Sequence, residues 1–251
     1  MGSLIYNTII AKKLVNKKML ALLVDPDKFF DSSIKKRILS INTSQVDFVF
    51  VGGSLVNLSV ENCIVKLRDH FNCPIVLFPG NPSQVTNVAD CMLYLSLISG
   101  RNSEFLIGQH VVSALSVKNT GIEIIPTGYI LVDGGNITSV QYISNTMPIP
   151  NGKSDICTST AIAGELLGLK MIYLEAGSGA NKIVSPEMIK SVAENIQIPI
   201  IVGGGIRDKH NAQSIYSAGA DIIVIGTAAE ENDSVIQQIS SVRDYFNTSN
   251  S

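Results

Sequence analysis

Short apolar runs recur along the whole chain, and longer amphipathic segments separate them. The runs span residues 19–24, 46–51, 74–78, 92–98, 122–132, 170–175, 198–202 and 221–225. An alternation of this kind is typical of β/α units arranged around a parallel sheet. Because eight runs are present, the pattern predicts an α/β protein of the (β/α)8 TIM-barrel class.

The segments between the runs predict helices at 31–42, 57–70, 104–119, 157–168, 185–196, 208–218 and 231–246. Asp, Asn or Ser precedes the first turn of several of them, as expected for helix caps. The third connection, 79–90, is short and contains two prolines, so we expect irregular chain at the third helix position. A long excursion with few apolar positions, 133–156, is typical of a functional loop or lid.

No linker or block of charge divides the 251 residues, so a single domain spanning 1–251 is expected. A doubly wound open sheet would also alternate strands with helices, but its phosphate-binding glycines would follow the first strand. Here the glycines gather after the last three runs. Barrels commonly hold phosphate in the loops after strands seven and eight, so the position of the glycines favours the barrel.

Composition excludes several classes of partner. The net charge is −2 and the basic residues are scattered, which argues against a nucleic-acid partner. No apolar run approaches the ~20 residues of a membrane-spanning helix, and the N-terminus lacks a long apolar signal segment. No C-x-x-C pair occurs, so buried reduced thiols in a cytoplasmic protein are expected for Cys63, Cys73, Cys91 and Cys157.

The stretch PIIVGGGIRD places three glycines directly after the seventh apolar run. Such glycines let the backbone approach a phosphate oxygen, and residues 206–208 then open a helix whose N–H groups favour an anion. Gly226 and Thr227 supply matching donors after the eighth run. A phosphate site is therefore predicted at Gly204, Gly205, Gly226 and Thr227, with tight turning at the barrel end as the alternative.

The sixth run ends in YLEAGSGA, which puts Glu175 at a strand end beside a flexible polar loop. A desolvated carboxylate there can accept a proton from a substrate hydroxyl. A structural ion pair on the rim is the alternative for Glu175. Tyr173 points to the same side of the strand, either to hydrogen-bond the ligand or to pack at the rim.

The first run ends in DPDK, and the second in VGGS. Asp25 and Ser54 are the candidate Mg²⁺ ligands, because this ion usually takes one or two carboxylates together with phosphate oxygens and water. Asp27 is expected to stabilise the turn. No cluster of His and Cys supports zinc, and the three histidines, His70, His110 and His210, are expected on solvent-facing helix surfaces.

Taken in order, the segments LLVDPDK, VGGS, LFPGNPSQV, YLSLISGRN, PTGYILVDGG, YLEAGSGA, IIVGGGIRD and AGADIIVIGTAAE closely resemble the geranylgeranylglyceryl phosphate synthase family, also called PcrB-like prenyltransferases. The resemblance covers about residues 19–230 and points to the archaeal-like and Bacteroidetes-like group. It implies a barrel enzyme that joins sn-glycerol 1-phosphate to a polyprenyl diphosphate, with a C20 chain favoured, and releases diphosphate with Mg²⁺. It also implies a homo-oligomer, either a dimer or a hexamer.

Carried onto this sequence, the resemblance assigns Mg²⁺ to Asp25 and Ser54. It assigns the glycerol phosphate to Tyr173, Leu174, Glu175, Ala176, Gly177, Ser178, Gly179, Gly204, Gly205, Gly226 and Thr227. The family's irregular chain at the third helix position agrees with segment 79–90. The excursions at 79–90 and 133–156 are then the expected walls of an apolar groove for the prenyl tail.

Other interpretations stay open at this point. Arg101 would assist the diphosphate or form a structural pair with an acid. Another phosphate-binding barrel enzyme, of the sugar-phosphate isomerase or aldolase type, would need a paired acid and base or a Schiff-base lysine at a strand end. A non-catalytic binder of prenyl or glycerol phosphates would keep the fold without turnover.

Overall fold

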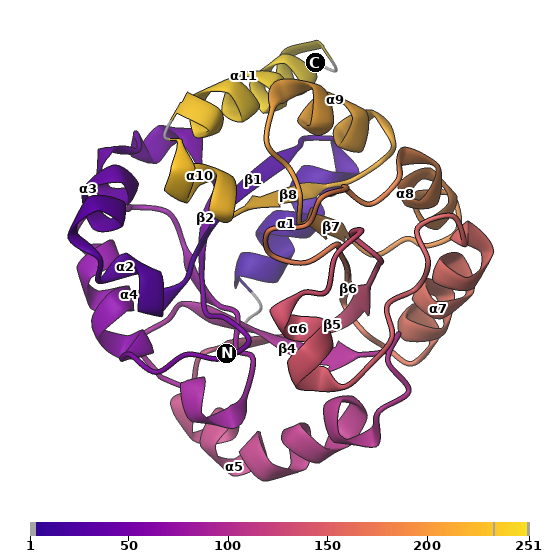
Figure 1. Cartoon of the computed structure of the whole chain (residues 1–251), viewed down its shortest axis with the longest axis horizontal. Helices are drawn as coiled ribbons and strands as arrows, with labels where there is room; N and C mark the ends of the chain where they lie inside the picture. The colour runs from indigo at the N-terminus through magenta and orange to yellow at the C-terminus, as the bar shows by residue number, and fades with distance from the viewer. Residues whose placement is uncertain (1–3, 233, 250–251) are drawn as a thin grey trace.

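A closed parallel barrel forms the centre of the molecule in the computed structural model, which describes residues 4–232 and 234–249 (Figure 1). Each strand pairs with the next along the chain, and β1 closes the barrel by pairing with β8. The strands are β1 Met19–Val24, β2 Phe48–Val51, β3 Ile75–Leu77, β4 Cys91–Leu97, β5 Glu123–Leu131, β6 Met171–Glu175, β7 Ile200–Gly203 and β8 Ile222–Ile225. The predicted fold class is confirmed, and every predicted run contains a strand.

Alternate residues of each strand serve two different cores, because side chains along a strand point to opposite faces. On β1, Met19 and Ala21 pack inside the barrel, whereas Leu20 and Leu22 pack outward against the helices. Polar or charged side chains at inward positions near the carboxyl ends of the strands therefore face a common space at that end of the barrel.

The helices surround the barrel. They are α1 Leu4–Leu14, α2 Pro26–Phe29, α3 Ser32–Ser40, α4 Val60–Arg68, α5 Gln109–Thr120, α6 Ser139–Ser144, α7 Ser154–Leu166, α8 Pro186–Ala193, α9 Lys209–Ser217, α10 Thr227–Glu231 and α11 Ser234–Ser249. Short 3-10 turns occur at η1 Thr43–Gln45 and η2 Pro82–Gln84, and a π-helical turn, η3 Glu104–Gly108, leads into α5. None of the described helices is both long and apolar enough to cross a membrane.

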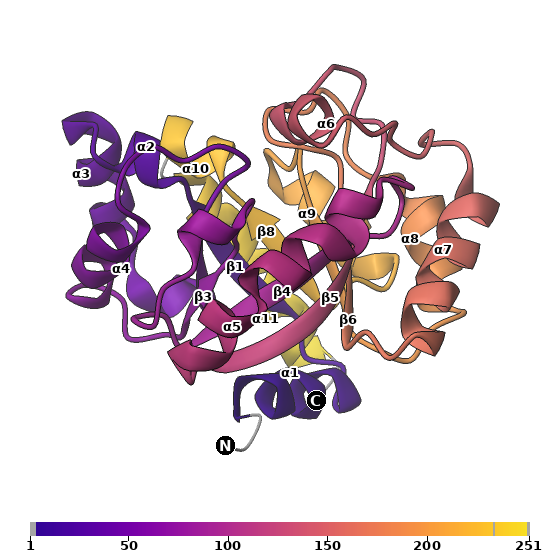
Figure 2. The same ribbon diagram turned by 90° about the horizontal axis from the view of Figure 1, so that it is seen from below.

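Four helices were not predicted from the sequence, namely α1, α2, α6 and α10. Helix α1 lies across the end of the barrel opposite α6 (Figure 2), and Glu123 accepts hydrogen bonds from the N–H groups of Ile5 and Tyr6. Helix α2 starts immediately after β1, and α10 starts immediately after β8. The predicted helix 231–246 corresponds to α11, which begins at Ser234 and extends to Ser249.

The two irregular connections have the character that the sequence predicted. Between β3 and β4 only η2 forms, which confirms irregular chain at the third helix position. After β5 the chain makes a parallel bridge between Val132 and Ile149 and one short helix, α6, before α7 begins. These two connections flank the open side of the barrel's carboxyl-terminal rim (Figure 1).

Candidate active site

The carboxyl ends of β1, β2, β6, β7 and β8 surround a cleft over the barrel mouth, which we call the polar cleft. Ten of the predicted site residues line it, namely Asp25, Ser54, Tyr173, Glu175, Ser178, Gly179, Gly204, Gly205, Gly226 and Thr227. The structure thus brings together residues from strands that lie far apart in the sequence. The role of each residue in binding or catalysis stays a prediction.

Three of the predicted residues do not line the polar cleft. Leu174 is fully buried in the outer core between the sheet and the helices. The N–H of Ala176 donates to the carbonyl of Gly203, and the N–H of Gly177 donates to Glu175 Oε1 at 2.6 Å. These residues shape the loop after β6, and the side chain of Leu174 faces away from the cleft.

Glu175 ends β6 with its side chain turned into the barrel mouth, and only 6% of the residue is exposed. Burial raises the pKa of its carboxyl to about 7, although the nearby Tyr173 hydroxyl and the Gly177 N–H both oppose this rise. The Tyr173 hydroxyl lies beside the carboxylate but completes no hydrogen bond of good geometry, so it is left unsatisfied. The pair therefore retains hydrogen-bonding capacity for a ligand.

The three glycines after β7 are explained first by packing around Glu175. A Cβ on Gly203 would come within 2.5 Å of the Tyr173 hydroxyl and 2.7 Å of Glu175 Oε2. Gly204 and Gly205 have φ of +86° and +72°, and a Cβ on Gly204 would lie 2.6 Å from Glu175 Oε1. The glycines thus make room for the carboxylate and also leave bare backbone on the wall of the cleft.

The loops after β6 and β8 meet at one end of the polar cleft, where Ser178 Oγ and Thr227 Oγ1 lie 3.0 Å apart. One sequence-based expectation fails here. The helix after the three glycines, α9, is capped by Asp208, whose carboxylate accepts the N–H of Asn211, so a negative charge already occupies that helix start. Backbone N–H groups at the start of α10, beginning with Thr227, have no acceptor within that helix.

Asp25 lies at the end of β1 with one oxygen, Oδ1, accepting the N–H of Asp27 at the start of α2. Burial raises the pKa of its carboxyl, although the Asp27 N–H opposes the rise. Asp27 itself accepts the N–H groups of Asn57 and Leu58, which confirms its structural role. Lys28, also at the cleft, pairs with Glu230 at 2.7 Å.

The donor set at Asp25 and Ser54 fits a hard divalent ion. A Cβ added to Gly53 would lie 3.6 Å from Asp25 Oδ2, so this glycine leaves space in front of the carboxylate. Carboxylate and hydroxyl oxygens are ligands that Mg²⁺ accepts, with substrate phosphate and water completing its shell. Among the described residues no three His, Cys, Asp or Glu side chains gather as a metal cluster. The site therefore suits an ion that arrives with a phosphorylated substrate.

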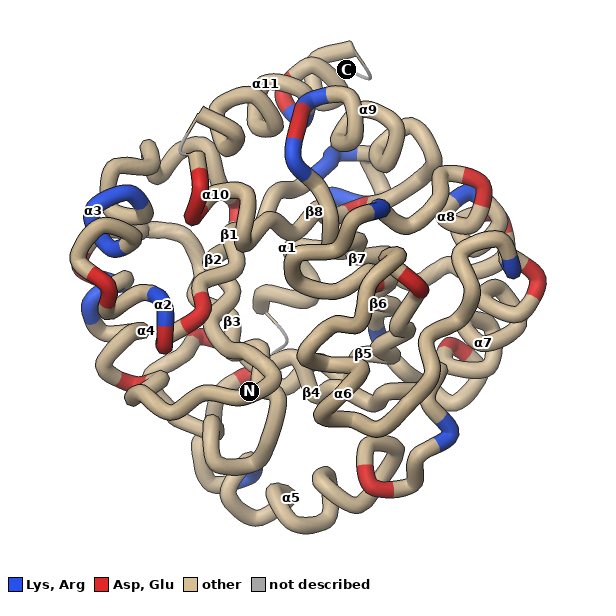
Figure 3. Tube along the Cα trace, in the orientation of Figure 1, with Lys and Arg blue, Asp and Glu red and all other residues tan. Residues whose placement is uncertain are grey.

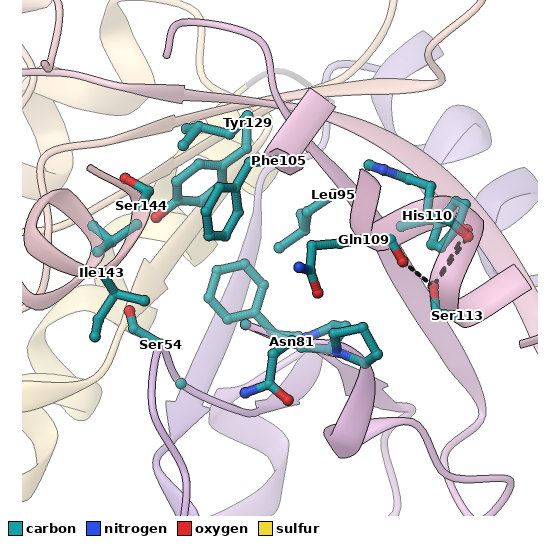
Figure 4. A pocket seen from close by; sticks show the side chains of 18 of the residues that line it. Ser54, Asn81, Leu95, Phe105, Gln109, His110, Ser113, Tyr129, Ile143 and Ser144 are labelled. Atoms are coloured by element: carbon teal, nitrogen blue, oxygen red, sulfur yellow. Dashed lines mark hydrogen bonds between the residues drawn. The ribbon is translucent and has the colours of Figure 1, made fainter. Parts of the chain in front are cut away.

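A second cavity, the apolar groove, runs from the polar cleft toward α5. Its walls come from the chain after β3, from β4 and β5, and from η2, η3, α5 and α6. Figure 4 shows Ser54 and Ile143 on one side of the groove and His110 and Ser113 on the opposite side. Five residues line both cavities, so the two form one continuous space; they are Gly53, Ser54, Phe78, Tyr129 and Val140.

Aromatic rings form the junction between the polar cleft and the apolar groove. The ring of Phe78 lies 5.4 Å from that of Tyr173 and 6.1 Å from that of Tyr129, and the two tyrosine rings are 5.3 Å apart. Sequence reasoning missed Phe78 and Tyr129. A period-two count back from the end of β5 would have found Tyr129, because it pairs in register with Tyr173 on β6.

The predictions for two histidines and one arginine need correction. His110 does not face solvent: it is half-buried on the wall of the groove, its Nε2 lies 3.0 Å from Ser96 Oγ, and burial lowers its pKa. His70 packs against Phe71 and contacts the carbonyl of Ile41, whereas His210 is exposed as predicted. Arg101 lines neither cavity and donates to the carbonyl of Ile98.

Comparisons with known proteins agree with this geometry. The PcrB family model matches residues 12–243. Curated relatives named geranylgeranylglyceryl phosphate synthase include one from Chitinophaga pinensis, 50% identical over 240 residues and covering 95% of each chain. Another, from Korarchaeum cryptofilum, is 35% identical over 229 residues, which is 91% of this chain and 94% of the relative.

A solved structure is similar over nearly the whole chain. It is the crystal structure of (S)-3-O-geranylgeranylglyceryl phosphate synthase from Thermoplasma acidophilum, in complex with its substrate sn-glycerol-1-phosphate. The TM-score is 0.89 and the sequence identity is 28%, with 98% of this chain and 99% of that chain covered.

Proposed function

Because the chain belongs to the PcrB family, we propose that it transfers a geranylgeranyl group from geranylgeranyl diphosphate to sn-glycerol 1-phosphate. The observation that carries the proposal is that the polar cleft, which Glu175 lines, adjoins the apolar groove at Phe78 and Tyr129. A small phosphorylated acceptor and a long apolar donor would then meet at one point, and that point has a carboxylate beside it.

The acceptor phosphate is assigned to the end of the cleft between β7 and β8. Gly204, Gly205 and Gly226 present backbone without side chains, and Thr227 adds a hydroxyl and the first N–H of α10. The glycerol hydroxyls then extend toward Glu175 and Tyr173, whose polar atoms face the same cleft. Hydrogen bonds from these two side chains would fix which hydroxyl reaches the donor.

Glu175 is assigned the role of general base. A pKa of about 7 leaves a large fraction of the carboxyl ionised at neutral pH, while burial keeps it basic enough to take a proton. As the acceptor oxygen bonds to the allylic C1 of the donor, its proton passes to Glu175. The bond between C1 and the diphosphate oxygen breaks at the same carbon, and its electron pair leaves with the diphosphate.

Asp25 and Ser54 are assigned to Mg²⁺, which would act as a Lewis acid toward the departing diphosphate. The Asp25 carboxylate keeps one oxygen on the N–H of Asp27 and has the other directed past Gly53. This arrangement holds the carboxylate in a fixed orientation. Positive charge that develops on the allylic carbon would face the aromatic rings of Phe78 and Tyr129 at the junction.

The C20 tail is assigned to the apolar groove. Its walls combine Phe78, Leu95, Phe105 and Val140 with backbone of the irregular chain at η2, where a full helix would occupy the space. Burial of a long hydrocarbon in such a groove is favourable by about 0.8 kcal/mol per CH2 group. Because only η2 forms between β3 and β4, space remains there for the prenyl tail.

The rival interpretations fit the geometry less well. Among the residues that line the polar cleft, the lysine is Lys28, which pairs with Glu230 from the rim and extends from no barrel strand. A Schiff-base aldolase mechanism lacks its lysine there. A non-catalytic binder would not require a buried carboxylate whose pKa is raised to about 7 in the wall of the polar cleft.

One assay separates these functions. The protein is incubated with radiolabelled sn-glycerol 1-phosphate, Mg²⁺ and prenyl diphosphates of several lengths, and the organic phase is then counted. We expect extractable label that depends on the C20 diphosphate. If the label stays in the aqueous phase although both ligands bind, the protein is a non-catalytic binder. If it converts a sugar phosphate instead, it is a different barrel enzyme.

A further inference from the structure

The chain around α6 exposes large apolar side chains at the rim of the apolar groove. Tyr142 is 80% exposed and Met147 84%, while Ile137 is 75% and Ile143 43% exposed. We call these four residues the α6 patch. Exposed side chains of this size on one short segment are unusual and point to contact with an apolar partner.

The same segment is free of charge. Residues 134–152 contain no Asp, Glu, Lys or Arg, although these types make up 16% of the whole chain. In Figure 3 no charged residue is coloured along α6. Charged groups that enter the apolar zone of a bilayer are costly, so an uncharged loop suits insertion into its surface.

Exposed basic residues border this segment. Lys153 follows it directly. The N–H of Lys182 donates to the carbonyl of Gly134, and Arg101 precedes Asn102, whose side chain donates to the carbonyl of Ser144. Two exposed acids, Asp133 and Asp155, border the segment as well, and Asp133 accepts the N–H of Gly135. The patch is therefore surrounded by charges of both signs that can meet lipid headgroups, while its apolar side chains would carry the contact with the bilayer.

The α6 patch is also continuous with the groove. Val140, Ile143 and Ser144 of α6 form part of the groove wall, and Ile143 belongs to the patch as well. A second protein seated on α6 would cover this edge of the groove. A bilayer would instead supply an apolar path along which a long hydrocarbon chain can enter it.

We propose that the α6 patch docks the protein on the surface of a lipid bilayer, so that a membrane-embedded C20 diphosphate enters the apolar groove without crossing water. This inference rests on the proposed function for its biological meaning, but docking itself requires no substrate. A hydrocarbon of this length partitions strongly into membranes, so delivery from a bilayer is the direct route.

The test uses the absence of tryptophan from the chain. Tyr142→Trp creates a single fluorescent probe in the patch, and Tyr245→Trp on α11 is the control, because Tyr245 is also exposed, at 64%. With vesicles of phosphatidylcholine and phosphatidylglycerol, we expect a blue shift and quenching by brominated lipid tails for Tyr142→Trp alone. Equal responses from both probes, or none from Tyr142→Trp, would overturn the proposal.

Flotation with the same vesicles supplies a second measurement. Tyr142→Ser/Met147→Ser should lower the bound fraction of the full chain roughly tenfold, as expected for withdrawing two large apolar side chains from lipid. The matched control, Leu14→Ser/Tyr245→Ser, removes two exposed apolar side chains elsewhere and should bind like the wild type. If Tyr142→Ser/Met147→Ser instead changes the sedimentation coefficient, the patch is a subunit interface and the proposal fails.

Activity distinguishes this inference from the proposed function. With a C20 donor embedded in vesicles, Tyr142→Ser/Met147→Ser should be slower than wild type, whereas a short water-soluble prenyl diphosphate should be used at the same rate by both. Vesicle binding without any prenyl transfer would leave docking established and refute the proposed function. Prenyl transfer at equal rates from vesicles by both proteins would refute docking as the route of delivery.

Discussion

Glu175 is held in a site that favours its neutral form, so its contribution to stability depends on pH. The pKa of its carboxyl is about 7 in the folded protein, whereas a glutamate free of the fold has the ordinary value of 4.5. Because the folded-state value is the higher one, the contribution is fully present below pH 4.5 and is lost as pH rises through 7. Ionisation of this one residue therefore makes the folded state less stable at alkaline pH.

The corresponding prediction compares wild type with Glu175→Gln, which cannot ionise but can still accept the Gly177 N–H. The free energy of unfolding of the variant, relative to wild type, should rise from pH 5 to pH 8 by up to about 3 kcal/mol, the equivalent of the pKa shift. Urea denaturation at several pH values measures this. A difference that stays constant with pH would show that Glu175 is not desolvated.

Gly226 offers the cleanest test of the phosphate end of the cleft. A substitution at Gly204 would disturb the fold itself, because its φ is positive and a Cβ would collide with Glu175 and the loop after β6. A Cβ on Gly226 meets Leu23 at an ordinary 3.5 Å and projects into the cleft. Because Gly226 has φ −121° and ψ −89°, outside the regions favoured by residues with a Cβ, Gly226→Ala should fold with a modest loss of stability, which urea denaturation measures alongside the affinity.

We expect Gly226→Ala to raise the acceptor Kd by roughly tenfold or more, in line with the ~1–3 kcal/mol that an extra methyl group costs in a close-packed site. Isothermal titration with sn-glycerol 1-phosphate is the measurement. Gly152→Ala, where a Cβ would meet nothing within 4 Å, is the control. An unchanged Kd for Gly226→Ala would show that the phosphate does not bind beside Gly226.

At the scale of elements, the start of α2 joins a structural role to the predicted metal site. Asp25 caps this helix through Oδ1, and Asn is an equally good cap, so Asp25→Asn removes charge while keeping the fold. Activity should fall by about 10²-fold or more and recover in part at high Mg²⁺, because Lewis-acid stabilisation contributes several kcal/mol.

A titration of rate against Mg²⁺ concentration measures this effect. Asp27→Asn is the matched control, since Asp27 is the neighbouring carboxylate and binds the loop at Asn57 instead of lining the cleft. Wild-type rates for Asp25→Asn across the whole titration would show that Asp25 is not a metal ligand.

The elements also show what the sequence could predict. The strands were evident because each apolar run is buried on both faces. Helix α10 was missed because Thr227 follows β8 without a loop, so no turn signal separates strand from helix. Helix α1 was missed because it buries only Ile5 and Ile9 among its residues, which leaves little periodicity to detect.

The candidate site was predicted unevenly for a related reason. Glu175 and the glycines stand out locally, since polar or flexible residues interrupt an apolar pattern there. Phe78 and Tyr129 look like ordinary core residues, and only closure of the barrel brings their rings beside Tyr173. The environment of His110 likewise depends on Tyr94 and Ser96 from another element. Such contacts are set by tertiary structure and leave no local signal.

For the whole molecule, the flank formed by η3, α5 and α7 is the surface we assign to self-association. Large exposed apolar side chains gather there, namely Ile107, Val111, Val112, Leu115, Ile156, Leu166 and Leu167. A depression lined by Leu106 of η3 and Ile156 of α7 lies between these two elements. A second copy of the chain would cover these exposed apolar side chains.

If a second copy binds this flank, Leu115→Glu should give a monomer, because a carboxylate in an apolar interface is costly to desolvate. Sedimentation velocity measures the change. Val65→Glu, on an exposed position of α4, should leave the oligomer intact. A wild-type monomer, or an oligomer that persists in Leu115→Glu, would contradict this assignment.

The central claim is that Glu175, in the polar cleft, takes the proton of the acceptor hydroxyl. The most direct measurement is kcat and acceptor Kd for Glu175→Gln with saturating C20 diphosphate and Mg²⁺. The account predicts a kcat lower by about 10²–10⁴-fold with a nearly unchanged Kd, since Gln has the same shape but is a far poorer base. A near-normal kcat with a large rise in Kd would contradict it and leave Glu175 as a residue that binds the acceptor.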